Sequence, residues 1–279
     1  MSVKTSLHRV MHARTSPYAV AIARMIIGFS AAFAAFEAWR MLPRVLPPMI
    51  VRVPFIAWLP HLPARAVPLF IGVWVLAALC FLIGWKTRIA GAIATLATGY
   101  TLFLDQQTYS NHFYLLFVIL LLLTIADSGA AWSLDACANG ARVDVAEWPI
   151  LLAKIQLTIV YVFSALAKIT PPYLAGEVLA LTLKTSWRDE PKIMSALAVA
   201  SIVLELFIGF GLWSRRLRIV AMIAGVSFHL LILTLVDSSR LSLGIFALAA
   251  FAVYALFAKK KGSDAIAGVR ALSKRENAY

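Results

Sequence analysis

Residues 112–127 read HFYLLFVILLLLTIAD and residues 149–169 read PILLAKIQLTIVYVFSALAKI. Both are close to the ~17–25 apolar residues that an α-helix needs to cross the hydrocarbon core of a membrane. The first run is short, so its helix is expected to begin earlier, inside the polar stretch DQQTYSNH at 105–112. Further apolar runs lie at about residues 18–39, 66–84, 88–104, 193–213, 217–236 and 241–258. Together the runs predict an all-α integral membrane protein with eight transmembrane helices in one bundle.

The composition excludes a soluble globular domain. Of the 279 residues, 62% are hydrophobic and 14% are charged, and the mean hydropathy is +0.85. Soluble domains carry roughly 25% charged residues. The net charge of +13 is attributed to cytoplasmic loops, which hold Lys and Arg beside membrane spans. The expected surroundings are therefore membrane lipids, and no nucleic-acid partner is expected.

The distribution of basic residues predicts the orientation of the bundle. With eight spans, both termini share one side of the membrane, and that side holds about twice as many Lys and Arg as the other. Both termini are therefore expected in the cytoplasm, which in a bacterium makes this an inner-membrane protein. The predicted organisation is a basic cytoplasmic N-terminus at 1–17, one transmembrane domain at 18–258 and a basic cytoplasmic tail at 259–279.

The segment after the first span has an unusual composition. Residues 40–68 read RMLPRVLPPMIVRVPFIAWLPHLPARAVP. Proline removes helix hydrogen bonds, so this segment is too rich in proline to span a membrane as a helix, yet it is too apolar for a solvated loop. An interfacial or re-entrant cover over the outer face is expected, because irregular backbone at membrane depth has to be covered by protein or to line a cavity.

Three ionisable residues stand out inside or beside the apolar runs. They are His112, Lys168 and His229, and ionisable groups at membrane depth are costly and often functional. The predicted topology brings all three to the outer half of the bundle, where they are expected to line one cavity. Lys168 could act as a base if it were buried away from any close carboxylate and so stayed neutral for part of the time.

Each of these residues also has a structural explanation. Lys168 lies close to a predicted helix end, so its side chain could extend to the interface and remain charged. His112 could be a hydrogen-bonded helix-start residue, with Asn111 as the helix cap, and His229 could be a satisfied core histidine. Two histidines on different helices could also ligate a haem, although no metal site is predicted.

Three further charged residues lie within spans. They are Arg24, Glu37 and Glu205, and an arginine–glutamate pair inside the bundle is the structural interpretation of them.

Five stretches carry a family resemblance. They are ARMIIGF (23–29), YSNHFYLL (109–116), SLDA (133–136), IVYVFSALAKITPPYLAGE (159–177), and FHLL (228–231) followed by SLGIF (242–246). In this order they resemble the HTTM family, the transmembrane domain shared by vitamin K-dependent gamma-carboxylase and its bacterial relatives. The resemblance covers nearly all of residues 18–258.

The resemblance implies roles for individual residues. Lys168 matches the lysine that acts as base on a reduced quinone, of the vitamin K or menaquinone type. His112 matches the histidine required for carboxylation, and His229 matches a histidine near the quinone site. Asn111 and Tyr114, from the same stretch as His112, are expected to contribute to cofactor binding.

Two departures from the family pattern limit what the resemblance implies. Ala167-Lys168 stands where the animal enzyme has paired lysines, and the large lumenal portion of that enzyme has no counterpart here. Carboxylation of protein glutamate is therefore not expected.

The sequence favours a gamma-carboxylase-like membrane enzyme or redox protein that binds a quinone and uses Lys168 as a base. The alternative is a non-enzymatic membrane protein that serves the maturation, export or immunity of a small peptide, and a di-histidine haem protein is the third interpretation.

Overall fold

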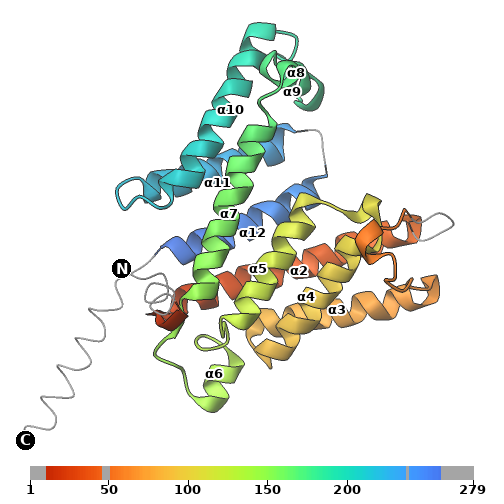
Figure 1. Ribbon diagram of the computed structural model, residues 1–279, viewed down its shortest axis with the longest axis vertical. Coiled ribbons are helices and arrows are strands. Elements are labelled where there is room, and N and C mark those ends of the chain that lie inside the picture. The colour runs from red at the N-terminus through yellow and green to blue at the C-terminus, as the bar shows by residue number, and fades with distance from the viewer. Residues whose placement is uncertain (1–10, 46–50, 237–238, 259–279) are drawn as a thin grey trace, which may run out of the picture.

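The computed structural model describes residues 11–45, 51–236 and 239–258. The predicted tail at 259–279 lies outside these residues, as do residues 1–10 of the predicted N-terminal segment. The described chain is almost entirely helical (Figure 1). The long helices are α2 (Pro17–Val45), α3 (Val67–Ile83), α4 (Thr87–Leu104), α5 (Asn111–Ile125), α7 (Trp148–Ala167), α10 (Pro191–Gly211), α11 (Arg218–Leu235) and α12 (Arg240–Phe257).

Short elements connect the long helices. They are β1 (Arg14–Thr15), η1 (Pro54–Ile56), η2 (Ala64–Ala66), η3 (Gln106–Thr108), α6 (Leu134–Asn139), β2 (Val145–Ala146), α8 (Pro171–Leu174) and α9 (Glu177–Thr182). Strands β1 and β2 pair in antiparallel fashion and join the start of the described chain to the segment that precedes α7.

Each predicted apolar run forms one long helix, but not all of these helices qualify as spans. Within the described ranges, six are long and apolar enough to cross a membrane: α2, α3, α7, α10, α11 and α12. Helix α5 has only 15 residues. Helix α4 has 18 residues but carries four threonines, and the hydroxyl groups of Thr95, Thr98 and Thr101 donate to backbone oxygens of the same helix. Eight spans therefore remain a prediction.

One helix end differs from its sequence-based boundary and another agrees with it. Helix α2 continues to Val45 and includes Pro43, well beyond the expected end near residue 39. Helix α5 begins at Asn111, inside the polar stretch 105–112 as expected, although only one residue before the apolar run. The preceding residues turn away because the Asp105 side chain accepts from the backbone N–H of Gln107 and caps the short helix η3.

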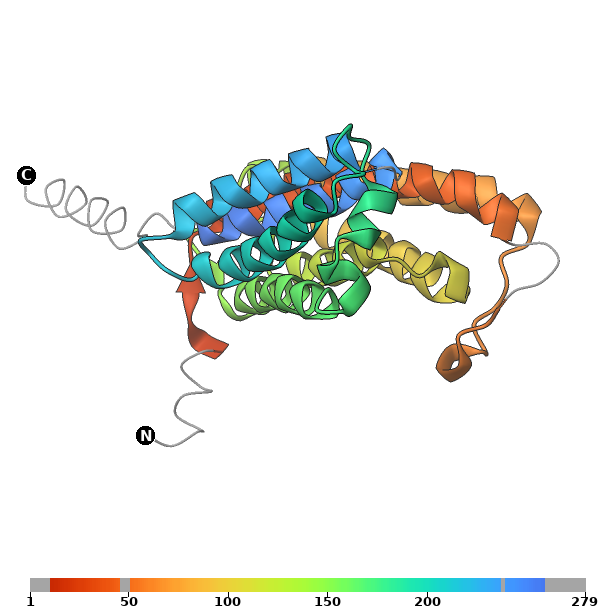
Figure 2. The ribbon, with the colours of Figure 1, turned by 90° about the horizontal axis from the view of Figure 1, so that it is seen from above.

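The described part of the Pro-rich segment lies against the ends of α4 and η3. The backbone N–H of Val51 donates to Asp105 Oδ2 at 2.6 Å, and the Tyr100 hydroxyl donates to the Pro60 carbonyl at 2.9 Å. Figure 2 shows the segment extending away from the long helices. Phe55 and Trp58 are about three-quarters exposed, at 74% and 75%. An interfacial or re-entrant position in a membrane remains a prediction.

The long helices form two layers (Figure 2). One layer contains α11, α12, α2 and α3 in that order, and the other contains α10, α7, α5 and α4; neighbours within each layer pack against one another. Contacts of α12 with α5 and α7, of α2 with α5, and of α3 with α4 hold the layers together. Side chains of α2, α12, α5 and α7 can therefore meet between the two layers.

Paired side chains establish the helix directions. Ser30 donates to the Ile245 carbonyl and Ser242 donates to Glu37, so α2 and α12 run antiparallel. The start of α2 and the end of α12 consequently lie at the same end of the bundle, called here the Arg24 end. The opposite end, where α7 terminates at Lys168, is called the Lys168 end.

Arg24 fixes the loop at the Arg24 end. Its guanidinium is fully buried and donates from Nη1 to the Ser128 carbonyl at 3.2 Å and from Nη2 to the Trp132 carbonyl at 2.6 Å. The sequence-based expectation of an arginine–glutamate pair is therefore wrong. Charge-assisted bonds from Nη1 and Nη2 to backbone oxygens hold the cation instead, while Nε has no hydrogen-bond partner among the described residues. These bonds join α2 to the loop between α5 and α6.

Candidate functional site

Lys168 forms an ion pair with Glu205 between α7 and α10. Lys168 Nζ lies 2.6 Å from Glu205 Oε2, and the Ser164 hydroxyl donates to Glu205 Oε1 at 2.9 Å. The Glu205 side chain is only 6% exposed and that of Lys168 is 23% exposed. The condition set from the sequence, a lysine remote from any carboxylate, is therefore not met. The structure also pairs Glu205 with a lysine and not with an arginine.

The end of α7 explains the position of this lysine. Lys168 is the C-cap of the helix, and Thr170 that follows is extended because Pro171 restricts the residue before it. The chain then folds through α8 back towards α10. The rings of Tyr173 and Phe228 are each centred 5.9 Å from Lys168 Nζ, within the range of a cation–π contact. One carboxylate and two aromatic rings thus surround the ammonium group.

A second group of polar side chains joins three helices. The Tyr161 hydroxyl of α7 lies 2.9 Å from His229 Nε2 of α11 and is also hydrogen-bonded to the Tyr254 hydroxyl of α12. All three residues are buried, with exposures of 2% for Tyr161 and 5% for each of the others. His229 is further enclosed by the rings of Phe246 and Phe251. We call Tyr161, His229 and Tyr254 the Tyr–His–Tyr cluster.

A glycine makes this cluster possible. Gly225 lies one helical turn before His229 on α11. A Cβ atom at this position would lie 2.0 Å from the Tyr254 hydroxyl oxygen. The absence of a side chain at 225 therefore leaves the space into which the Tyr254 hydroxyl projects.

His112 belongs to a different group of side chains. Its Nε2 lies 3.1 Å from Glu37 Oε2 of α2, and the other carboxylate oxygen of Glu37 accepts from the Ser242 hydroxyl of α12 at 2.6 Å. The side chains of His112 and Glu37 are 11% and 17% exposed. This histidine–glutamate–serine group connects both layers at the start of α5 and of α12. Glu37 therefore pairs with a histidine, again not with an arginine.

The neighbours of His112 lie differently from their expected positions. Ser110, in extended conformation, is the N-cap of α5, and Asn111 is already the first helical residue. The expectation that Asn111 caps this helix is therefore wrong. Tyr114 faces α7, where its hydroxyl oxygen accepts from Gln156 Nε2 at 3.3 Å.

The sequence-predicted residues thus divide between two regions. Lys168 and His229 lie near one another, because Phe228, which precedes His229, is in contact with Lys168. His112, with Asn111 and Tyr114, lies at the start of α5. A single cavity lined by all three ionisable residues remains a prediction.

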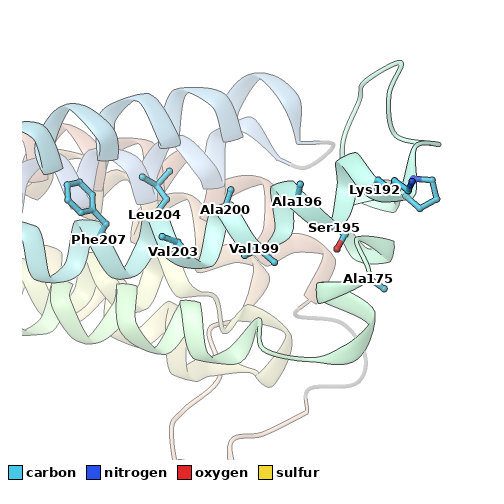
Figure 3. A pocket seen from close by; sticks show the side chains of 10 residues that line it. Ala175, Lys192, Ser195, Ala196, Val199, Ala200, Val203, Leu204 and Phe207 are labelled. Carbon is cyan, nitrogen blue, oxygen red and sulfur yellow. The ribbon is translucent and has the colours of Figure 1, made fainter.

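A groove runs along α10 (Figure 3). Its volume is about 1160 Å³, and it is lined mainly by the apolar residues Ala196, Val199, Ala200, Val203, Leu204 and Phe207, with Lys192 and Ser195 at one end. Leu204 precedes Glu205 in the chain, so the groove runs along the same turns of α10 as the carboxylate, but neither Glu205 nor Lys168 is among its lining residues. An apolar groove of this kind suits the hydrocarbon part of a ligand.

Several residues of the site were not identified from the sequence. Tyr161, Ser164 and Lys168 are spaced by three, four and seven positions along α7, which places them on one helix face. This spacing was a detectable signal. Tyr254 gave none, because a tyrosine near a helix end is also typical of membrane interfaces.

Comparison with known proteins establishes the family. No solved structure matches the chain. The family described as the HTTM domain matches residues 12–261, which include nearly all of the described helices. The resemblance found in the five sequence stretches is thereby confirmed, and the chain belongs to the HTTM domain family.

Proposed function

We propose that this protein is a membrane enzyme related to vitamin K-dependent gamma-carboxylase, and that Lys168 and Glu205 handle a proton of a lipid-soluble hydroquinone. The supporting observation is the 2.6 Å contact between Lys168 Nζ and a carboxylate that is almost fully buried. Charged groups in an apolar interior are rare because they are costly. A pair of this kind between two helices therefore marks a site where a proton is held.

The ion pair is compatible with a lysine base. In a region of low dielectric constant, a charged pair can become neutral when the proton moves from one partner to the other. Transfer from Lys168 Nζ to Glu205 Oε2 leaves a neutral amine, which can accept a proton from a weakly acidic hydroxyl. Ser164 donates to Glu205 Oε1 and holds the carboxylate in place during this exchange.

The residues present fit a quinone. The groove along α10 offers an apolar surface for an isoprenoid chain, and the rings of Tyr173 and Phe228 lie beside Lys168 where a planar head group would be placed. A bound hydroquinone supplies an acidic hydroxyl group and two reducing electrons. The role of the chain is to orient that hydroxyl toward Lys168 and to exclude water.

His112 suits a supporting role in the same enzyme. Glu37 Oε2 lies 3.1 Å from its Nε2, and Glu37 accepts in turn from Ser242, so side chains of two other helices lie against the ring. A histidine oriented by a carboxylate can exchange protons with a substrate.

The orientation in the membrane is part of the proposal. With α4 and α5 counted as crossings, the chain crosses eight times and the Arg24 end faces the cytoplasm, in keeping with the positive-inside bias. The Lys168 end then faces outward from a bacterial inner membrane. Labelling of single cysteines introduced at Lys86 and Arg215 from the inside only is the expected result, and labelling of both from the outside contradicts it.

The test compares Lys168 with a lysine outside the site. Protein reconstituted with menaquinol-4 in air is expected to consume the quinol faster than lipid alone, as measured by chromatography. Lys168→Arg should abolish this excess while the protein stays folded, because guanidinium remains protonated at neutral pH. Lys86→Arg, at an exposed position at the Arg24 end and outside the site, is the control and should retain it. Full quinol consumption by Lys168→Arg would contradict the proposal.

One observation favours the non-enzymatic alternative. Lys168, Glu205, His112 and His229 each have a partner within the protein, as expected if they only join helices. The protein would then be a scaffold for maturation, export or immunity of a small peptide. Equal quinol consumption with and without the protein would favour it.

A di-histidine haem site is less compatible with the structure than either of these functions, since Nε2 of both histidines already contacts a side chain.

A further inference from the structure

We infer that the face of α7 directed into the bundle forms a proton path between the Lys168–Glu205 pair and the Arg24 end. The inference rests on the proposed proton-handling role of that pair. The face carries five residues with polar side chains, spaced by three or four positions: Lys154, Thr158, Tyr161, Ser164 and Lys168. This spacing aligns them along one side of a helix. Polar and ionisable residues aligned through a membrane helix are typical of proton relays.

The opposite face of α7 has a different character. Leu152, Ile155, Ile159, Phe163 and Leu166 are all exposed and follow the same spacing. Their exposure is expected for side chains that face lipid. Apart from Gln156, which bonds Tyr114 of α5, the polar side chains of α7 are therefore collected on the side of the helix that faces into the bundle.

The middle of the path is the Tyr–His–Tyr cluster. The Tyr161 hydroxyl contacts both His229 Nε2 and the Tyr254 hydroxyl, so it can accept one proton while donating another. A neutral histidine can also do both through its two ring nitrogens. The cluster thus has the chemical capacity to pass a proton on, and it is buried from bulk water.

The end of the path near Arg24 is formed by Lys154 and Thr158. The Thr158 hydroxyl donates to the Lys154 carbonyl at 3.1 Å and accepts from Trp213 Nε1 at 2.8 Å. Lys154 Nζ lies 5.2 Å from the centre of the Phe257 ring. Phe257 follows Tyr254 by one helical turn on α12. The contact of Lys154 with Phe257 therefore places Lys154 one turn from the Tyr–His–Tyr cluster along α12 as well as along α7.

The remaining steps need bridging water. Tyr161 is separated from Ser164 and from Thr158 by one helical turn each, about 5–6 Å between Cβ atoms, and the inference requires water molecules to join their hydroxyl groups. From Lys154 to Lys168 the path is about 21 Å long at ~1.5 Å per residue, most of the ~30 Å hydrocarbon core. One proton enters the chain of groups at one end as another leaves at the other, so each group regains its original proton count.

The path provides a route by which Lys168 can release the proton that it has accepted. A base that removes a proton in every turnover has to release that proton before the next one. Release along α7 delivers it to the Arg24 side, whereas direct release at the Lys168 end delivers it to the opposite side.

Proton flux into vesicles tests the path without any quinone. The purified protein is reconstituted in vesicles of phosphatidylcholine and phosphatidylglycerol that enclose a pH-sensitive dye, and a potassium diffusion potential drives protons inward. Wild-type vesicles should acidify faster than protein-free ones. Tyr161→Phe should lower the excess rate about tenfold, which equals ~1.36 kcal/mol added to the barrier.

A matched tyrosine serves as the control. Tyr100→Phe also removes one hydroxyl group and one hydrogen bond, to the Pro60 carbonyl, but lies outside the path and should keep the wild-type rate. Tyr254→Phe provides a second variant of the cluster if Tyr161→Phe does not fold. An unchanged rate in either folded cluster variant, or a wild-type rate equal to that of empty vesicles, overturns the inference. Because the assay contains no quinol, loss of flux and loss of quinol consumption are distinguishable.

Discussion

Helices α2 and α11 lie in the same layer of the bundle, but they are held in different ways. In the apolar part of α2, 56% of the residues are buried, compared with 17% in α11. The buried face of α2 consists largely of small residues that let α3 and α12 approach closely. The buried residues of α11 are Ala221, Gly225 and His229, and the last is held by a tyrosine hydroxyl.

The two regions also use their buried polar groups differently. Arg24 of α2 binds backbone carbonyls of a loop, which fixes the protein without leaving a mobile proton. The groups around α11 bind other ionisable or hydroxyl-bearing side chains, between which protons can be exchanged. We therefore expect substitutions around Arg24 and Gly28 of α2 to affect stability, and substitutions near α11 to affect function.

The largest loss of stability is expected from Arg24→Ala. The change removes two hydrogen bonds from a charged donor, each worth about 1.5–3 kcal/mol, and leaves the carbonyls of Ser128 and Trp132 without this partner. Thermal unfolding in detergent should show the loss. Arg44→Ala is the control, because Arg44 is exposed at the other end of the same helix, and it should change little. Equal stability of the two variants would show that the loop is not held by Arg24.

A smaller loss is expected from Gly28→Ala on the same helix. A Cβ atom here would lie 2.7 Å from the backbone of Leu82 on α3, and overpacking of this kind costs about 1–3 kcal/mol. Gly72→Ala is the matched control, because a Cβ atom at Gly72 meets nothing within 4 Å. The control should be neutral or slightly stabilising. A stable Gly28→Ala variant would show that α2 and α3 can separate without loss.

The pH dependence of the Arg24 end should depend on Asp135. Partial burial opposes the charged form of this carboxyl group, but bonds from the Thr87 hydroxyl and from the backbone N–H groups of Thr87 and Lys86 outweigh it and lower the pKa of Asp135. Its stabilising contribution is therefore complete above the unfolded pKa of about 4 and is lost as the pH falls through the folded value.

The corresponding variant is Asp135→Asn. It should be less stable than wild type by about 1 kcal/mol at pH 7, the typical worth of a capping side chain. The difference in melting temperature should shrink as the pH is lowered toward 3. A constant difference between pH 7 and pH 3 would contradict the role assigned to the carboxylate.

The sequence was most informative where one helix alone decides the outcome. Apolar runs predicted most helix boundaries. The spacing of Tyr161, Ser164 and Lys168 could also have predicted that these three residues share one face of a helix. The bonding partners of a side chain on other helices were not predictable, because they depend on which helix faces pack against one another. Arg24 was expected to bind a glutamate, yet its acceptors are carbonyls of a loop whose path the residue types do not determine. Glu205 could not be assigned to Lys168 for the same reason.

The smallest effect on stability, and the sharpest difference between the regions, is expected from Gly225→Ala. The new methyl group would meet the end of the Tyr254 side chain, which can rotate away, whereas Gly28→Ala meets backbone. Alanine also favours a helix over glycine by about 0.5–1 kcal/mol, which offsets the roughly 0.5–1.5 kcal/mol of the hydrogen bond that Tyr254 loses, so the net change in stability should be close to zero.

Displacement of Tyr254 breaks its bond to Tyr161, and proton flux into vesicles should fall as it does in Tyr161→Phe. Gly28→Ala should lose stability and keep its flux. If Gly225→Ala conducts protons at the wild-type rate, the Tyr254 hydroxyl is not part of the path, and the region around α11 is held by side-chain bonds that have only a structural role.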